Sequence, residues 1–201
     1  MFEASIYKSF VIRLFFLKPI IISFPRSGKS YLQANLVFAF KKDFDFSHLN
    51  RPGQIKKLDY YDHLIALVRN PIDSISSIVA MELEFDKNLE INDSINDRIK
   101  EYINFYSFAL KNADTFIYFN DIVDNINKVV EYVSLVTNYP ILNNEPKNNI
   151  IKNLKGHKFL KTSKETGKYK EIVFAVKNKD LDECLKLYKN ALEMCIKINA
   201  D

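Results

Sequence analysis

The feature that most constrains this chain is a short apolar run that stops at a charged turn containing glycine. Residues 19–24 read Pro-Ile-Ile-Ile-Ser-Phe, and Pro-Arg-Ser-Gly follows at 25–28. A β-branched run of this length, bounded by a turn, is typical of a strand buried in a parallel sheet. Residues 29–42 then carry apolar side chains at helical spacing, so we expect a helix to begin directly after the turn.

The same alternation of strand and helix continues along the chain. Further strands are predicted at 43–47, 63–68 and 115–119, and helices at 71–85, 93–113, 121–136 and 180–198. Strands that alternate with helices form a parallel sheet with helices on both faces. We therefore predict a three-layer, P-loop-like α/β domain with a central parallel β-sheet, and ligands beyond the carboxyl ends of its strands.

Composition limits the classes of protein that fit this pattern. A chain of 201 residues with 47% hydrophobic content can bury one sizeable core, so we expect a single domain over 1–201. Its net charge of +4 suits an anionic ligand. Because it has no arginine-rich run and no Cys/His finger spacing, we expect no nucleic-acid partner.

Cysteine and hydropathy patterns bear on the compartment. Cys184 and Cys195 fall eleven residues apart in one predicted helix, about 16 Å at the rise of an α-helix. They cannot pair there, so we expect reduced thiols in the core and a cytoplasmic protein. The apolar stretch 10–24 is interrupted by Arg13 and Lys18, so we expect neither a membrane anchor nor a signal peptide.

The turn after the first predicted strand carries groups that bind phosphate. Residues 23–30 read Ser-Phe-Pro-Arg-Ser-Gly-Lys-Ser, where a helix N-terminus follows a strand and its N–H groups favour an anion. A glycine there lets the backbone approach a phosphate closely. The alternative is a plain strand-turn-helix joint with surface charges. The candidate ligands are Arg26, Ser27, Gly28, Lys29 and Ser30.

A second segment offers another anion ligand. Residues 67–73 read Leu-Val-Arg-Asn-Pro-Ile-Asp, and Ser77 lies eight residues after Arg69. An arginine at the end of a strand can hold a phosphate with a bidentate fork, and a serine two turns into the next helix can donate from the same side. The alternative is local: Asn70 as N-cap and Pro71 at the first position make a good helix start alone.

In this order the two motifs resemble those of the sulfotransferase family. The first is similar to its 5′-phosphosulfate loop, and the Arg69 to Ser77 segment to its 3′-phosphate motif. The resemblance implies 3′-phosphoadenosine 5′-phosphosulfate (PAPS) as donor, 3′-phosphoadenosine 5′-phosphate (PAP) as product and no metal ion. The acceptor would be a hydroxyl or amine of a small molecule or carbohydrate. Lys29 stands where the family usually has threonine.

Two looser similarities follow downstream. Residues 118–122, Tyr-Phe-Asn-Asp-Ile, fall where the family often has Tyr-Glu-Asp-Leu. Residues 161–169 occupy the position of its late cofactor loop, with Gly167 matching. Ser163 and Lys164 are candidates for the 3′-phosphate there, and an exposed lysine-rich loop is the alternative.

The resemblance also implies catalytic roles. Arg26 and Lys29 would stabilise charge on the departing nucleotide. His48 is the candidate base, because it follows a predicted strand and precedes Arg69 by twenty-one residues, close to the family's interval. The lysine that usually stands two residues before this histidine is missing. A carboxylate, Glu82 or Glu84, is the alternative base.

Two other functions fit parts of the sequence. A P-loop kinase or nucleotidase using ATP and Mg²⁺ would use residues 28–30, Gly-Lys-Ser, with an acidic residue near Asp121 for the metal. It requires Ser23 in place of the first P-loop glycine and gives Arg69 no role. A binding module without turnover would use the same anion ligands. Residues 81–104, the predicted acceptor wall, define no particular acceptor.

Overall fold

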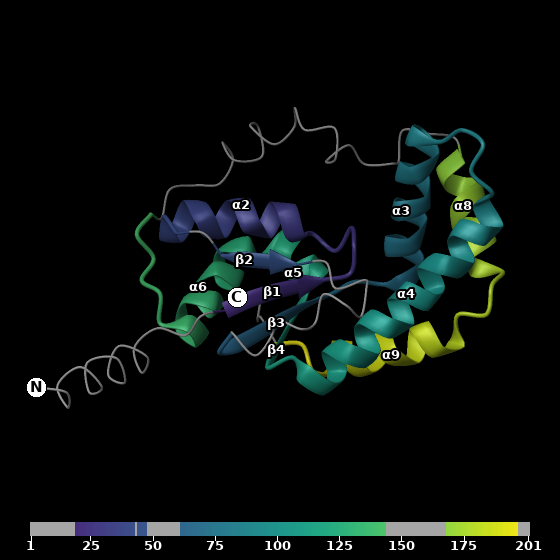
Figure 1. The fold of residues 1–201 in the computed structure, drawn as a ribbon. Coiled ribbons are helices and arrows are strands. Elements are labelled where there is room, and N and C mark those ends of the chain that lie inside the picture. The colour runs from purple at the N-terminus through teal and green to yellow at the C-terminus, as the bar shows by residue number, and fades with distance from the viewer. Residues whose placement is uncertain (1–18, 43, 48–60, 144–167, 197–201) are drawn as a thin grey trace, which may run out of the picture.

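A parallel sheet of four strands lies at the centre of the protein (Figure 1). The computed structural model describes residues 19–42, 44–47, 61–143 and 168–196. The strands are β1 (Pro19–Ser23), β2 (Asp45–Ser47), β3 (His63–Val68) and β4 (Thr115–Tyr118), in the order β2-β1-β3-β4. Ile22 pairs with Ser47 on one side and with Ala66 on the other. The prediction of a central parallel sheet is confirmed.

Helices cover both faces of this sheet (Figure 1). One face packs against α2 (Lys29–Phe40), α5 (Phe119–Asp124) and α6 (Ile126–Thr137). The other packs against α3 (Pro71–Phe85), α4 (Ile91–Asn112), α8 (Lys168–Lys177) and α9 (Asp182–Glu193). Because successive strand residues point to opposite faces, Ile21 packs with the first group and Ile22 with the second. The three-layer α/β prediction is therefore confirmed.

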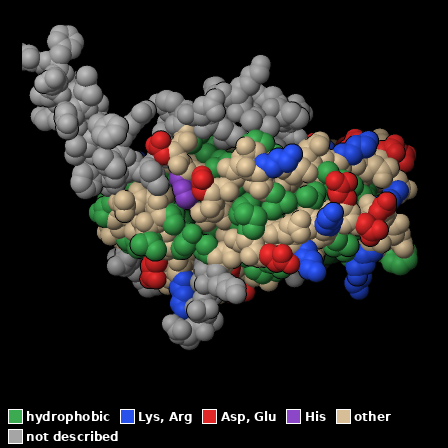
Figure 2. Space-filling view, turned by 90° about the horizontal axis from the view of Figure 1, so that it is seen from below, with side chains coloured by type: hydrophobic (Ala, Val, Ile, Leu, Met, Phe, Trp, Pro, Cys, Tyr) green, Lys and Arg blue, Asp and Glu red, His purple; other side chains and the backbone are tan. Residues whose placement is uncertain are grey.

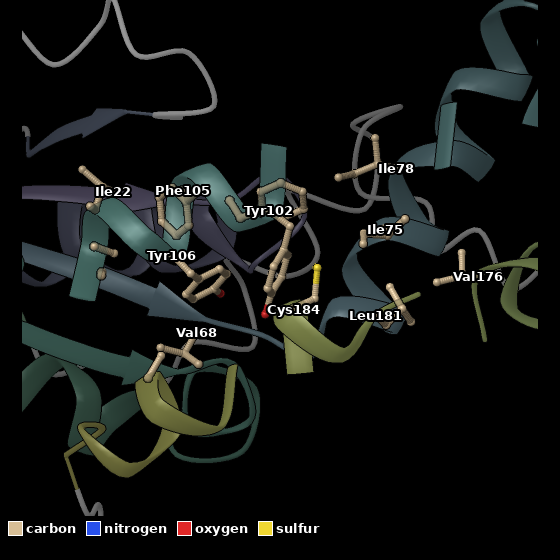
Figure 3. Packing of buried hydrophobic residues seen from close by; sticks show 14 of the residues in the cluster. Ile22, Val68, Ile75, Ile78, Tyr102, Phe105, Tyr106, Val176, Leu181 and Cys184 are labelled. Carbon is tan, nitrogen blue, oxygen red and sulfur yellow. The ribbon is translucent and has the colours of Figure 1, made fainter. Parts of the chain in front are cut away.

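The larger of the two cores contains most of the buried aromatic side chains. Tyr102, Phe105 and Tyr106 of α4 are fully buried in it, together with Phe24 from the end of β1. Figure 3 shows the three α4 side chains reaching toward the strands, near Ile22 and Val68. This core therefore joins α4 to the carboxyl ends of β1 and β3.

Two predicted helices differ from the observed ones. The helix predicted over 121–136 is divided into α5 and α6 at Asn125, whose backbone is not helical (φ −131°, ψ 37°). The helix predicted to reach residue 198 ends at Glu193, and Cys195 instead forms a parallel bridge with Phe116 of β4. Cys184 is buried and Cys195 partly buried, and both are free thiols, as expected.

The lysine-rich segment before the last helix contains α8, which the sequence interpretation missed. Ile172 and Val176 lie four residues apart on its inner face and are fully buried in the larger core. Two buried aliphatic side chains dock this helix despite its many lysines.

The surface carries interspersed charges. The face over α4 and α9 has lysine or arginine and acidic side chains mixed along it (Figure 2). In the part of the chain that the structure describes, none of the helices has the length and apolar character needed to cross a membrane.

Candidate functional site

The two predicted phosphate motifs meet at the point where the sheet reverses its strand order. From β1 the chain passes to β2 on one side, whereas from β3 it passes to β4 on the other. β1 and β3 are paired, with Ser23 beside Leu67 at their carboxyl ends. In open α/β sheets ligands bind beyond the strands at such a switch point. The segments that begin at Phe24 and Arg69 therefore flank the expected ligand position (Figure 1).

The first loop has the backbone of an anion-binding turn. Arg26 and Gly28 both adopt the left-handed conformation, with φ of 65° and 83°. A positive φ is uncommon for a residue with a side chain, and alternation of such conformations can turn successive N–H groups toward one concave side. Gly28 precedes α2, which has no acidic residue in its first turn. The N-terminus of α2 therefore presents unpaired N–H groups without a competing carboxylate.

Gly28 is also required by packing. A Cβ atom at this position would lie 3.0 Å from Cδ2 of Phe119, the first residue of α5. A larger residue would thus strain the backbone and press on a neighbouring ring. Besides the predicted close approach of a phosphate, the packing of the loop against α5 therefore also favours glycine at this position.

The second motif begins α3 as its local pattern predicts. The side chain of Asn70 accepts hydrogen bonds from the N–H groups of Ile72 (2.9 Å) and Asp73 (3.4 Å), and Pro71 is the first helical residue. Ser77 lies on the buried side of this helix and is 5% exposed. The capped start thus fixes Ser77 relative to Arg69 on the preceding turn.

Hydrogen bonds join the two motifs directly. The Arg26 Nε–H group donates to Ser77 Oγ at 2.9 Å. Arg69 donates through Nη1 to the carbonyl oxygen of Arg26. Residues from segments 43 and 51 positions apart in the chain are thereby in contact. The structure thus brings Arg26, Arg69 and Ser77 together, in direct contacts that were not predicted from the sequence.

Two buried donors at this junction have no hydrogen-bond partner within the described residues. They are Ser27 Oγ and Arg69 Nε. The Tyr106 hydroxyl lies close to Ser27 Oγ, but no well-directed hydrogen bond joins them. Leaving a buried donor unpaired costs about 1–3 kcal/mol. A bound anion would satisfy Arg69 Nε, which shares one edge of the guanidinium with Nη2.

Burial makes the site more receptive to negative charge. It lowers the pKa of Arg26, of Lys29 and of Arg69 from their usual values. The carboxylate of Glu84 raises the pKa of Arg26 in part, as Asp73 does for that of Arg69. The guanidinium of Arg26 in turn lowers the pKa of Arg69. Burial of all three cations and the repulsion of Arg69 by Arg26 both favour an anion beside them.

Three aromatic residues that the sequence interpretation left without a site role hold Arg69. Its guanidinium carbon lies 4.2 Å from the ring centre of Phe119. Its backbone N–H donates to Tyr106 Oη, and its carbonyl accepts from Tyr102. Phe119 could have been found because it ends a predicted strand. In the sequence, Tyr102 and Tyr106 are only two apolar positions of a predicted helix. Their neighbours in the sequence do not indicate that they bind the backbone of Arg69.

Several predicted site residues lie outside the described residues. His48 follows Ser47, the last residue of β2 and a neighbour of Ile22. Ser163 and Lys164 precede α8 in the chain. Tyr169, from the same late segment, is in the first turn of α8, within electrostatic range of Arg69. Ser30 is exposed at the second position of α2.

The two alternative carboxylate bases have different surroundings. Glu82 accepts a hydrogen bond from Ser94 Oγ at 2.5 Å and pairs with Arg98 Nη2 at 2.9 Å. Glu84 is exposed and close enough to Arg26 to affect its pKa. Because Glu82 is held by two partners, Glu84 is the better alternative base.

The site presents two groups that favour anions, the N-terminus of α2 and the guanidinium of Arg69. Asp121 lies in α5, where burial raises its pKa. Within the described ranges, no group of three or more His, Cys, Asp or Glu side chains is arranged to hold a metal ion.

Searches of family models, curated proteins and solved structures found no match to this chain. Function is therefore inferred from the residues of the site.

Proposed function

We propose that this chain is a sulfotransferase that moves a sulfuryl group from PAPS to a hydroxyl or amine of a small-molecule or carbohydrate acceptor. The observation that carries the proposal is the contact between the two motifs. Arg26 of the first donates to Ser77 of the second, and Arg69 donates to the Arg26 carbonyl. A donor with phosphate groups at both 3′ and 5′ positions needs two such anion sites near each other.

The first loop would hold the 5′-phosphosulfate. The N–H groups at the start of α2 supply donors, and Lys29 and Arg26 supply charge. The Ser27 and Ser30 hydroxyls add donors, and Ser27 Oγ is buried with no hydrogen-bond partner among the described residues. Gly28 gives the turn its left-handed conformation. This loop therefore fits the end of the donor that carries the reacting sulfur.

The second motif would hold the 3′-phosphate. Arg69 Nε, which has no hydrogen-bond partner in the part of the chain that the structure describes, lies on the edge of the guanidinium that can form a bidentate pair with two phosphate oxygens. Ser77 Oγ, now an acceptor from Arg26, can donate its own proton to the same phosphate. Ser163 and Lys164 are proposed as further ligands of this group.

Transfer would follow a direct displacement. His48 accepts the proton of the acceptor hydroxyl or amine, and the acceptor oxygen or nitrogen forms a bond to sulfur. The bond from sulfur to the bridging oxygen of PAPS breaks, so PAP leaves with the electron pair on its 5′-phosphate. Arg26 and Lys29 stabilise that charge. Every step uses side chains and donor only, so we propose no metal ion.

The proposed location is the cytoplasm. Both cysteines are free thiols, and neither forms a disulfide within the described residues. Thiols in this state are typical of a reducing compartment.

Calorimetric titration without Mg²⁺ tests the donor assignment. We expect PAP to bind at least about tenfold more tightly than adenosine 5′-phosphate, since one charge-assisted hydrogen bond contributes about 1.5–3 kcal/mol. Equal affinities would refute the proposal. Tighter binding of ATP with Mg²⁺ than of PAP would favour the kinase. PAP binding without sulfuryl transfer to a broad acceptor panel would favour a binding module.

A further inference from the structure

Two tyrosines of α4 hold the backbone of the residue proposed to bind the 3′-phosphate. Tyr106 Oη accepts a hydrogen bond from the Arg69 N–H at 3.0 Å and donates to the Leu67 carbonyl at 3.1 Å. Tyr102 Oη donates to the Arg69 carbonyl at 2.8 Å. The N–H and the carbonyl group of Arg69 are thus each hydrogen-bonded to a tyrosine of α4. Tyr106 lies 37 positions and Tyr102 33 positions after Arg69 in the chain.

Arg69 needs such partners because it lies between two regular elements. β3 ends at Val68, and α3 begins at Pro71 after its cap residue Asn70. Among the described residues, no hydrogen bond from the sheet or from α3 is found to the N–H or carbonyl group of Arg69. Buried backbone groups without partners are costly. The hydroxyl groups of Tyr106 and Tyr102 supply these hydrogen bonds. They thereby fix the backbone position from which the Arg69 side chain extends.

The tyrosine rings are themselves immobilised. Tyr102 and Tyr106 are both fully buried, with ring centres 4.3 Å apart. Phe105 packs edge-on against Tyr106 at 4.9 Å. Burial raises the pKa of both phenols well above the usual value, so each keeps the proton that it donates.

The same cluster also touches the first loop. Phe24, which follows β1 and begins that loop, lies edge-on to Tyr102 with ring centres 5.0 Å apart. It also packs against Phe105 at 6.3 Å. Tyr102, Phe105 and Tyr106 of α4 therefore contact the starting residues of both segments, Phe24 and Arg69.

We infer that Tyr102 and Tyr106 are positioning residues that set the affinity of the site for a 3′-phosphate by fixing the backbone of Arg69. Together they form the tyrosine pair. The inference rests on the proposed function. Neither phenol needs to touch the nucleotide. Their effect passes through Arg69, whose guanidinium must present its Nε edge at a defined place.

The test measures the preference for PAP over adenosine 5′-phosphate in Tyr106→Phe and Tyr102→Phe. Each change removes one hydroxyl and keeps the ring. We expect the ratio of the two Kd values to fall about tenfold in Tyr106→Phe and less in Tyr102→Phe, mainly through weaker PAP binding. A purely structural loss would weaken both ligands equally and leave the ratio unchanged.

Two controls make the result specific. Tyr188→Phe removes another partly buried phenol, which contacts Tyr118 at 3.4 Å and makes no hydrogen bond to Arg69 within the described residues, so its ratio should match wild type. In an Arg69→Ala background, Tyr106→Phe should cause no further loss of preference, because the residue that it positions is gone. If Tyr106→Phe does not fold, Tyr102→Phe gives the same test.

The outcomes separate the two claims. An unchanged ratio in folded tyrosine variants, or an equal further loss in the Arg69→Ala background, overturns the role of the tyrosine pair while the donor assignment stands. No preference for PAP in the wild-type protein overturns the proposed function and this inference with it.

Discussion

Replacing Gly28 by alanine tests the geometry of the first loop. At φ 83° an L-residue is strained, and the left-handed conformation costs about 1–2 kcal/mol for a residue with a side chain. The added Cβ would also lie 3.0 Å from the Phe119 ring, closer than atoms normally pack. The Phe119 ring also packs against the guanidinium of Arg69. A shift of this ring would therefore disturb Arg69, which is itself a proposed phosphate ligand. We expect Gly28→Ala to destabilise the protein and to weaken PAP binding.

The size of the effect can be measured by urea unfolding. A loss of about 2 kcal/mol with an m value of about 2 kcal/mol per molar urea lowers the midpoint by about 1 M. Calorimetry on the folded fraction of Gly28→Ala should show weaker PAP binding, because both the turn at residue 28 and the packing of Arg69 on the Phe119 ring are displaced. The measurement therefore reports stability and site geometry in the same variant.

A double variant separates the two causes. Phe119→Ala removes the ring that the new Cβ would meet, so Gly28→Ala in that background should cost only the backbone strain of about 1–2 kcal/mol. A Gly28→Ala variant that unfolds at the wild-type midpoint and binds PAP with wild-type affinity would contradict this role of the loop. An equal loss of stability with and without Phe119 would show that the ring contact contributes nothing.

Three further predictions concern the cap, the lysine and the base. Asn70→Ala should lower the free energy of unfolding by about 1 kcal/mol, as measured in urea, because two N–H groups of α3 lose their acceptor; an unchanged midpoint would contradict the cap. Burial lowers the pKa of Lys29, so PAP binding should weaken as the pH rises through that lowered pKa and Lys29 loses its charge. Lys29→Arg should remove this alkaline decline in affinity. A wild-type affinity for PAP that stays constant to high pH would argue against Lys29 as a ligand. His48→Ala should leave PAP binding unchanged and lower turnover by about 10²–10⁴-fold; normal turnover would make Glu84 the base to test.

The predictable parts of the fold are those with a local cause. Residues 19–23 form a fully buried strand because their β-branched side chains fill both faces of a parallel sheet. Asn70 and Pro71 begin α3 because one supplies a cap oxygen and the other needs no N–H partner. The position of both motifs at one edge of the sheet follows from the strands that they end, since the carboxyl ends of adjacent parallel strands share one edge.

The parts that could not be predicted have causes distant in sequence. Phe119 ends a predicted strand, which places it at the edge of the sheet, but its contact with the guanidinium of Arg69 depends on a residue 50 positions earlier in the chain. The break at Asn125 interrupts a continuous apolar period, which one long helix would equally satisfy. α8 is rich in lysine, and its docking depends on two buried aliphatic side chains whose partner, α3, lies far back in the chain.

The central claim is that Arg69 and Ser77 hold a 3′-phosphate. The most direct measurement compares the Kd of PAP with that of adenosine 5′-phosphate in the wild-type protein, in Arg69→Lys and in Ser77→Ala, without Mg²⁺. The account predicts a clear wild-type preference for PAP that falls about tenfold or more in Arg69→Lys, which loses the bidentate fork, and falls less in Ser77→Ala. Equal wild-type affinities, or a preference that both variants retain in full, would contradict it.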